Sequence, residues 1–212
     1  MDRKKLNSIT VNAPDSQKPI LNECCPNLKI VFLQDNFLTS IGNAFQGLKN
    51  VTQINLYNNL ISDMDIFDDC VNLRKLYMEN NRISLLAGLR NCQRLEELYL
   101  GNQQIGNKQF SFDEYSLAAI SNTMEVLDLP AVNLVTCKPL YFLERLITLN
   151  LNDNLIDNFD EQVVPMLMTL QNLRNLNMHR NPVVKNTPKF RDQVILLTRP
   201  QFTELDGKTI KA

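Results

Sequence analysis

The chain of 212 residues is poor in the side chains that enzymes use at catalytic sites. It has one histidine, His179, so a serine–histidine or cysteine–histidine pair would have to be built around it. No spacing in the sequence forces a nucleophile or an acidic residue beside that histidine. The triplet GKT begins at Gly207, but Phe202 stands where a phosphate-binding loop requires glycine. We therefore predict a protein that is not an enzyme, with no cofactor and no metal site.

The sequence also lacks long hydrophobic runs and an excess of charge. No stretch approaches the roughly 18 apolar residues of a membrane span. Lysine plus arginine total 22 against 23 acids, for a net charge of -1, which gives no electrostatic reason to bind nucleic acid or an anionic membrane. The start, MDRKKLNSITVNAPDSQ, contains no apolar run and so no secretory signal. We expect a cytoplasmic protein with free thiols, and neither nucleic acid nor membrane among its partners.

What the chain does contain is an internal repeat of about 22 residues. LRKLYMENNRISLL from Leu73 and LITLNLNDNLIDNF from Leu146 share the template L-x-x-L-x-L-x-x-N-x-I/L. This template resembles the leucine-rich repeat, which implies an α/β solenoid with a curved parallel sheet on its concave face and short helices and turns on its convex face. We predict a single domain over residues 1–212, with repeats that start near residues 6, 28, 51, 73, 95, 124, 146 and 173.

Each position of the template has a structural role. Positions one, four and six supply the apolar core of a short strand and its approach. The asparagine at position nine can bond free backbone groups where the chain leaves the strand. Gln103 and Val132 replace this asparagine in two successive copies, so we expect the ladder to lapse there. The asparagines that form the predicted ladder are Asn36, Asn59, Asn81, Asn154 and Asn181.

The register also accounts for the cysteines. Cys25, Cys70 and Cys92 fall at position twenty of their copies, and Cys137 falls at position fourteen, where other copies carry large apolar residues. We interpret all four as small apolar core residues rather than as metal ligands or a disulfide. Cys24 has no core position, and we expect it to be exposed.

The repeats depart from the template in three places. The fourth copy is long, with extra residues at 101–123, where DEYSLAAISNT predicts a helix capped by Asp113 or Ser111. This insertion is either a longer convex helix or a protruding loop that contacts a partner. VVPMLMTLQN predicts a full helix in the sixth copy. After the last copy, RDQVILLT and FTEL predict a C-terminal cap at about 182–211 that shields the last coil.

Positions three, five, seven and eight face the concave surface, where folding does not require aromatic side chains. Adjacent exposed aromatics form amphipathic strips of the kind that carry binding energy, although scattered exposed aromatics are ordinary. We predict a partner-binding surface here. Its aromatic members are Phe32, Tyr57, Tyr77 and Tyr99, and its acidic members are Glu79, Glu97, Asp128 and Asp153.

The chain resembles the leucine-rich-repeat regulatory subunits of protein phosphatase 1 over roughly residues 28–210. The ending LDGK at Leu205 is typical of that group, and LEELYLGNQQIGNKQFSFDEYSLAAISNTMEVLDL is similar to its testis type. The resemblance implies a concave face, rich in acids and aromatics, that grips the phosphatase catalytic subunit. Phe32, Tyr57, Tyr77, Glu79, Glu97, Tyr99 and Asp128 fit that description, whereas Asn150, Asn152 and Asn177 make the C-terminal part more polar.

Similar short proteins also serve in cilia and flagella, among them the leucine-rich light chain of outer-arm axonemal dynein. That resemblance implies an alternative role as an adaptor of the axoneme or cytoskeleton, with an axonemal or microtubule-associated partner. A third use of the fold is as a scaffold in ribonucleoprotein particles. The run KIVF from Lys29 matches the peptide that docks on phosphatase 1, but the register places it within a strand of the second copy.

Overall fold

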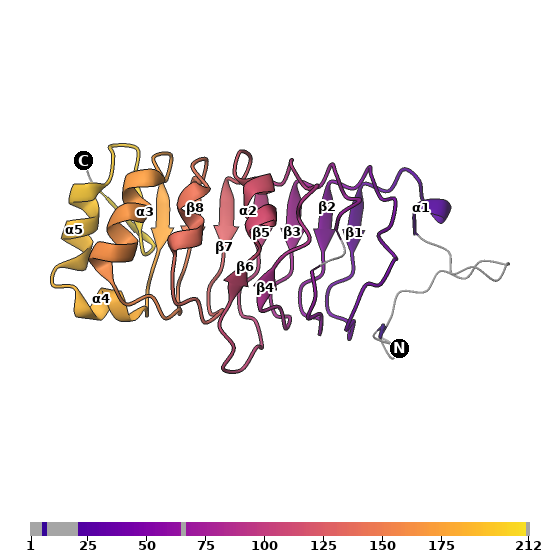
Figure 1. Cartoon of the computed structure of the whole chain (residues 1–212), viewed down its shortest axis with the longest axis horizontal. Helices are drawn as coiled ribbons and strands as arrows, with labels where there is room; N and C mark the ends of the chain where they lie inside the picture. Colours follow the sequence, from indigo (N-terminus) through magenta and orange to yellow (C-terminus); the bar gives the residue numbers. More distant parts are fainter. Residues whose placement is uncertain (1–5, 8–20, 65–66, 211–212) are drawn as a thin grey trace.

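The computed structural model describes residues 6–7, 21–64 and 67–210 of the chain. Short parallel strands stand side by side in one long sheet, and their spatial order follows their order in the chain (Figure 1). These strands are β1 (Ile30–Phe32), β2 (Gln53–Asn55), β3 (Lys75–Tyr77), β5 (Glu97–Tyr99), β7 (Val126–Asp128), β8 (Thr148–Asn150) and β9 (Asn175–Asn177). The sheet ends with β10 (Glu204–Leu205), parallel to β9, and β11 (Lys208–Thr209), antiparallel to β10. The predicted solenoid fold is confirmed.

The repeat template explains why these residues form strands. In β2, β3 and β5 the central residue is fully buried while its two neighbours are partly exposed. Leu76 pairs in register with Ile54 on one side and Leu98 on the other, so position four forms a continuous apolar row. The flanking positions three and five therefore all reach the same outer surface, which we call the concave face.

The residue at position eight adopts a left-handed backbone conformation in coil after coil. Its φ lies between 53° and 60°, a region that favours asparagine and aspartate among residues with a side chain. The sequence analysis did not assign this role. The residues concerned are Asp35, Asn58, Asn80, Asn102, Ala131, Asp153 and Arg180. The backbone conformation of the turn therefore determines which residues suit position eight, independently of any contact that the side chain makes.

The asparagine ladder is present, and it is longer than predicted. Asn81 accepts from the Ile61 amide at 3.0 Å and donates to the carbonyl of Met78 at 3.0 Å. Gln103, expected to break the ladder, makes the same bonds: it accepts from Ile83 N at 2.9 Å and donates to Met78 O at 2.9 Å. That prediction was wrong because the longer side chain still reaches the neighbouring coil.

Val132 does interrupt the ladder, as predicted. Its neighbour compensates in part, because Asn154 Oδ1 accepts from both Val132 N at 3.2 Å and Leu134 N at 2.9 Å. One amide oxygen therefore serves two backbone donors, and the turn keeps its shape without a polar side chain at position nine.

The cysteines divide into buried and exposed thiols. Cys70, Cys92 and Cys137 are completely buried, and burial raises the pKa of each thiol to about 12. Cys24 is exposed, as expected. Cys25 is exposed as well, so its placement in the core was wrong. It follows α1 (Leu21–Cys24), in the copy predicted from residue 6, which the structure describes only in part.

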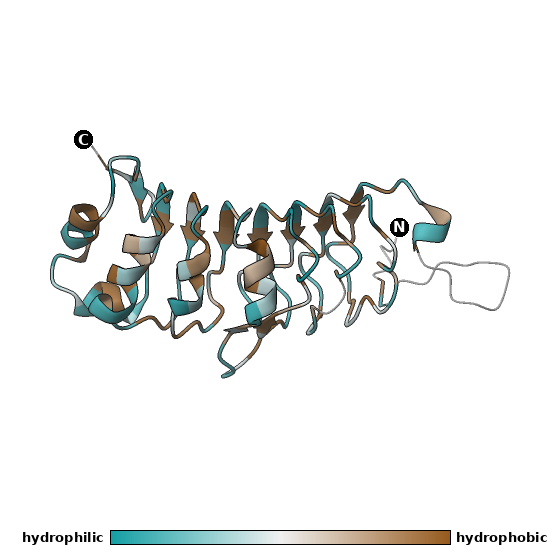
Figure 2. Ribbon diagram, turned by 45° about the horizontal axis from the view of Figure 1, so that its top comes forward, coloured by the Kyte–Doolittle hydropathy of each residue, from teal (hydrophilic) through white to brown (hydrophobic). Residues whose placement is uncertain are grey.

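The convex side carries the helices and a second, small sheet (Figure 2). The insertion at 101–123 forms β6 (Ser111–Phe112), paired with β4 (Leu85–Leu86), and then α2 (Glu114–Ile120). The Asp113 carboxylate caps α2 by accepting from Ser116 N at 3.0 Å. It also accepts from the Ser116 hydroxyl at 2.9 Å, and this second bond is the main reason that the pKa of Asp113 lies below its usual range. Further along lie the 3-10 helix η1 (Lys138–Phe142), the π-helical turn η2 (Phe159–Val163) and α3 (Val164–Thr169).

Helices also cover the last coil, in the region predicted as a cap. α4 (Pro182–Asn186) is followed by α5 (Phe190–Leu197), and Phe190 meets the ring of Phe159 edge-on at 5.7 Å. Phe202 and Leu205 are buried beneath the end of the chain. Most of the copy predicted from residue 6 lies outside the described residues. No helix in the described part of the chain is long and apolar enough to cross a bilayer.

Candidate functional site

The predicted aromatic strip lies on the concave face. Tyr77 and Tyr99 are register partners on β3 and β5, and their rings stack with centroids 4.7 Å apart and planes only 6° from parallel. Phe32 on β1 is 61% exposed, and Tyr57 is 37% exposed. We call these four residues the aromatic strip. Asn55 of β2 stands between Phe32 and Tyr77, so the strip consists of one stacked pair and two separate rings.

A hydrogen-bonded neighbour holds the stacked pair in place. The Tyr99 hydroxyl donates to Glu97 Oε2 at 3.2 Å, and the Lys75 ammonium lies 2.8 Å from Glu97 Oε1. This contact raises the pKa of Lys75. Glu97 was predicted as part of the partner-binding surface, but it already binds one internal cation, Lys75, and one hydroxyl donor, Tyr99. Its position beside Tyr99 makes it a positioning residue for the aromatic pair.

Glu79 and Asp128 differ from Glu97 because, within the described residues, neither forms an ion pair with a cation. Burial raises the pKa of Glu79, and the nearby Asp128 charge adds to the effect. Burial also raises the pKa of Asp128, although a 2.7 Å hydrogen bond from Asn150 Nδ2 opposes the shift. Glu79 Oε2 is buried and has no hydrogen-bond partner. These carboxylates are therefore poorly solvated and lack a compensating charge in the described structure.

A glycine, Gly101, lies on the coil between those that carry Glu79 and Asp128. Position seven is Glu79 in one coil, Gly101 in the next and Pro130 in the one after. A Cβ at Gly101 would lie 2.6 Å from Pro130 Cγ and 3.4 Å from Asp128 Oδ2. Glycine is thus required for Pro130 and Asp128 to approach the sheet as they do.

The C-terminal part of the concave face is internally paired. Asp153, predicted as an open acid, forms an ion pair with Arg180 of the next coil, and Arg180 Nη2 donates to Asp153 Oδ2 at 2.5 Å. His179 is exposed, with Nε2 3.2 Å from the Asp206 carbonyl and Nδ1 3.9 Å from its carboxylate. Among the described residues, no hydroxyl or thiol is hydrogen-bonded to this histidine.

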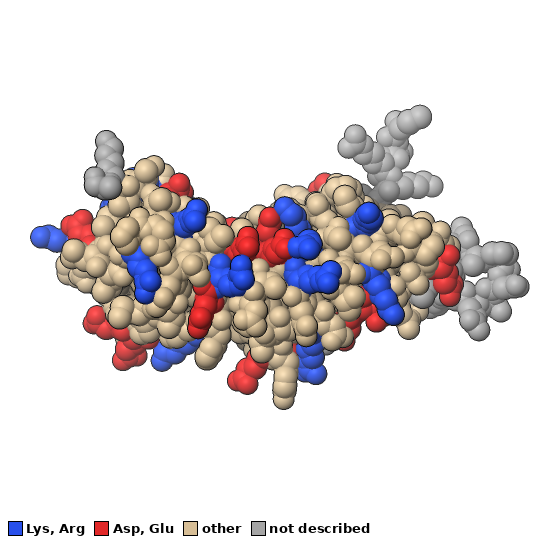
Figure 3. Space-filling model, turned by 90° about the horizontal axis from the view of Figure 1, so that it is seen from above, with Lys and Arg blue, Asp and Glu red and all other residues tan. Residues whose placement is uncertain are grey.

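Figure 3 shows acidic and basic side chains side by side near the middle of the molecule. The sequence placed the aromatic and acidic side chains on one face by register alone, and the structure places them there. The sequence analysis did not predict the ion pairs of Lys75 with Glu97 and of Arg180 with Asp153, because it did not compare charged residues in adjacent coils. The signal was available: residues about one repeat apart, such as Lys75 and Glu97, are neighbours in a solenoid.

Known proteins agree with this architecture. Two family models match: "Leucine rich repeat" over residues 26–83 and "Leucine Rich repeats (2 copies)" over residues 71–112. No curated protein matches the chain in sequence. Among solved structures, an internalin of Listeria monocytogenes is 21% identical, with 87% of this chain and 62% of that chain covered and a TM-score of 0.59.

Two receptor structures are also similar. The Toll–Spätzle complex of Drosophila is 17% identical over 83% of this chain and 24% of that chain, with a TM-score of 0.64. The complex of TLR13 with a single-stranded RNA is 27% identical over 76% of this chain and 22% of that chain, with a TM-score of 0.63. The chain thus spans less than two thirds of each of these neighbours. Together, the repeat register, the family matches over residues 26–112 and the solenoid neighbours show that the chain has the leucine-rich-repeat fold.

Proposed function

We propose that the protein is a non-enzymatic binding module that holds another protein against its concave face. The stacked pair of Tyr77 and Tyr99 carries this proposal. The two rings lie outside the apolar core and are not needed to fill it. Stacking and the Glu97 hydrogen bond fix them before any partner arrives, which lowers the entropy lost on binding. Leucine-rich-repeat domains generally mediate protein–protein interaction, which fits this reading.

The acids beside the pair indicate the chemistry of the partner. Glu79 and Asp128 have lost part of their hydration without gaining a cation. A lysine or arginine from a partner would supply the missing charge, at a place already screened from water, where such a pair is strong. The favoured partner surface therefore presents an apolar or planar group to the tyrosines and a basic side chain to the acids.

The catalytic subunit of protein phosphatase 1 is the sharpest candidate for this partner. It is supported by the resemblance of the long fourth copy and the LDGK ending to the phosphatase regulators. The alternative is an adaptor of the axoneme or cytoskeleton without phosphatase binding, supported by the resemblance to ciliary proteins. In either case the contact would use the aromatic strip together with Glu79 and Asp128, while Glu97 and Asp153 hold the face in shape.

A titration against the phosphatase 1 catalytic subunit tests the proposal. The wild-type protein is compared with a Tyr77→Ala/Tyr99→Ala variant, in which each lost aromatic should weaken binding by about 2 kcal/mol or more. Tyr115→Ala is the matched control, because Tyr115 is 68% exposed on the convex helix α2. The control should bind like the wild type.

The outcomes distinguish the identity of the partner from the location of the binding surface. No binding by the wild type retires phosphatase 1 and moves the measurement to co-sedimentation with salt-washed axonemes, using the same three proteins. A partner that binds the double variant as tightly as the wild type, in either assay, shows that the aromatic strip is not the contact surface.

A further inference from the structure

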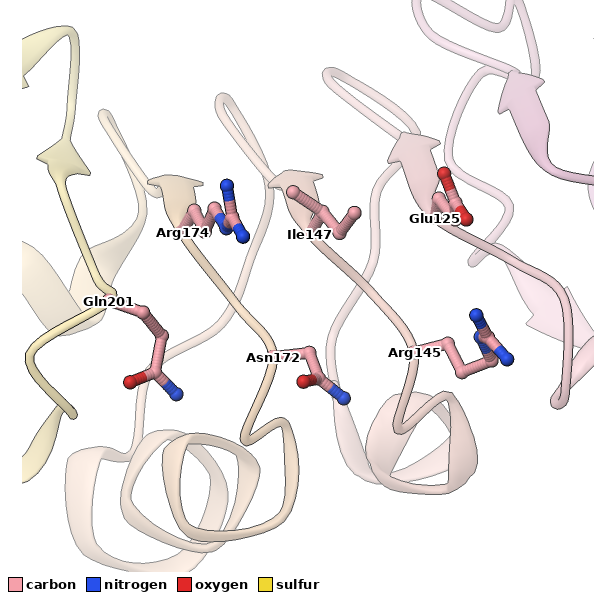
Figure 4. Close-up of a pocket in the computed structure, with 6 residues that line it drawn as sticks. All are labelled: Glu125, Arg145, Ile147, Asn172, Arg174 and Gln201. Atoms are coloured by element: carbon pink, nitrogen blue, oxygen red, sulfur yellow. The ribbon is translucent and has the colours of Figure 1, made fainter.

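A polar pocket lies on the flank of the concave face, at the turns that lead into β7, β8, β9 and β10. Its volume is about 370 Å³. Figure 4 shows its lining in two rows: one just before the strands and one in the preceding turns. The first row is Glu125, Ile147 and Arg174, and the second is Arg145, Asn172 and Gln201. None of these residues belongs to the aromatic strip.

The arginines of this pocket lack the partners that equivalent arginines have elsewhere. At position two, Arg74 forms an ion pair with Glu96 of the next coil. In the residue before position one, Arg94 donates to Asn72 Oδ1 at 2.7 Å.

The same two positions are occupied in the pocket by Arg174 and Arg145. Arg174 has Ile147 opposite it on the preceding coil and Thr203 opposite it on the next coil, where Arg74 has the acid Glu96. Arg145 forms no ion pair with Glu125 among the described residues. Within the described part of the chain, neither arginine side chain has an ion pair or a hydrogen bond. Both guanidinium groups are therefore available to an anion from outside, and they outnumber the single carboxylate in the pocket.

The amides of the pocket offer acceptors. Asn172 Nδ2 donates to Glu144 O at 2.9 Å, and Gln201 Nε2 donates to Gln171 O at 2.5 Å. These bonds fix both amides to the backbone through their N–H groups, and among the described residues neither amide oxygen accepts a hydrogen bond. Such oxygens accept N–H groups, which a polypeptide supplies along its length and a phosphodiester chain does not.

We infer that this pocket binds an extended acidic segment of the partner protein, with phosphorylated or carboxylate side chains at alternate positions facing Arg145 and Arg174. Alternate side chains of an extended chain point the same way and lie about 6.5 Å apart, a spacing that long arginine side chains on adjacent coils can match. Each guanidinium binds a carboxylate or phosphate through two parallel hydrogen bonds. The inference rests on the proposed function only in assuming a protein partner.

Short peptides test the pocket without knowledge of that partner. One peptide carries phosphoserine at two alternate positions, a second carries glutamate there, and a third carries serine. Binding is measured by calorimetry, and the Nε–Hε resonances of the arginines are followed by NMR. An Arg145→Gln/Arg174→Gln variant is compared with Arg82→Gln/Arg199→Gln, which removes the same charge from exposed arginines outside the pocket.

We expect saturable binding of the phosphopeptide, with loss by about tenfold or more in the pocket variant and none in the control. Equal binding of the glutamate peptide also supports the inference and shows that a carboxylate suffices. Binding of the serine peptide as tight as that of the phosphopeptide, or equal losses in the two variants, would overturn it.

Two further measurements distinguish a site for an acidic peptide from a nucleic-acid site and from the concave face. A short oligouridylate that binds more tightly than the phosphopeptide, and needs both arginines, would overturn the assignment to a protein segment. The Tyr77→Ala/Tyr99→Ala variant should still bind the phosphopeptide. If the wild-type protein binds the phosphopeptide but fails every binding test of the concave face, the proposed function is rejected. The inference that the pocket binds an acidic segment is then retained.

Discussion

At the scale of single residues, the concave face holds two kinds of carboxylate. Glu97 and Asp153 are paired with cations of neighbouring coils, whereas Glu79 and Asp128 are partly buried without one. Paired acids hold the surface in shape, and uncompensated acids cost stability in the free protein. An uncompensated charge at a surface position is the pattern expected where binding, rather than folding, selects the residue.

Glu79→Gln tests this cost through its dependence on pH. The pKa of Glu79 is higher in the folded protein than its ordinary value of 4.5, so the folded state holds the proton more tightly than the unfolded state. Ionisation of Glu79 therefore removes stability as pH rises from 4.5, and the loss is complete once the pH exceeds the raised pKa. The variant cannot ionise, so at pH 7 it should melt at a higher temperature than the wild type.

The advantage of the variant should shrink as the solution is acidified and vanish below pH 4.5, where Glu79 is neutral in both states. Glu144→Gln is the matched control, because Glu144 is exposed, and its melting temperature should follow the wild type. A Glu79→Gln protein that is less stable at pH 7 would show that a favourable contact, rather than lost hydration, dominates at this carboxylate.

At the scale of elements, each coil is a strand followed by a turn that borrows hydrogen bonds from its neighbour. The strands and the position-nine ladder were predictable, because apolar spacing and a polar residue at one register position repeat along the chain. The ladder role of Gln103 was not predictable, because the template requires asparagine at position nine and does not consider the reach of the longer glutamine side chain. The π-helical turn before α3 could not be predicted either, because such turns have no short sequence signature.

Asn81→Ala measures what one step of the ladder contributes. The side chain is fully buried, accepts from Ile61 N and donates to the carbonyls of Leu56 and Met78. Each buried backbone group left unpaired costs about 1–3 kcal/mol, so the variant should lose about 3 kcal/mol or more in urea unfolding. Asn107→Ala, at an exposed position in the insertion, should leave the midpoint unchanged. Equal midpoints for all three proteins would mean that water replaces the side chain at no cost.

At the scale of the whole molecule, the two halves of the concave face differ in kind. The N-terminal half carries the aromatic strip, and the C-terminal half carries asparagines and ion pairs that bond to one another. The register could place all of these residues on one face, but it could not show which were already satisfied. That distinction depends on neighbours in adjacent coils, and it separates the aromatic strip from the arginine pocket as two different surfaces.

A solenoid also transmits stability only between neighbours, so its cap should protect the nearest coils first. Phe190→Ala removes the α5 ring that packs on Phe159, at a cost of about 3–5 kcal/mol. Hydrogen exchange should then speed up in β9 and β8 while β2 and β3 keep their protection. Leu196→Ala is the control on the same helix, because Leu196 is 84% exposed. Uniform loss of protection from β2 to β9 would instead show that the coils unfold as one cooperative unit, so that a partner bound at the N-terminal half would stabilise the arginine pocket at a distance.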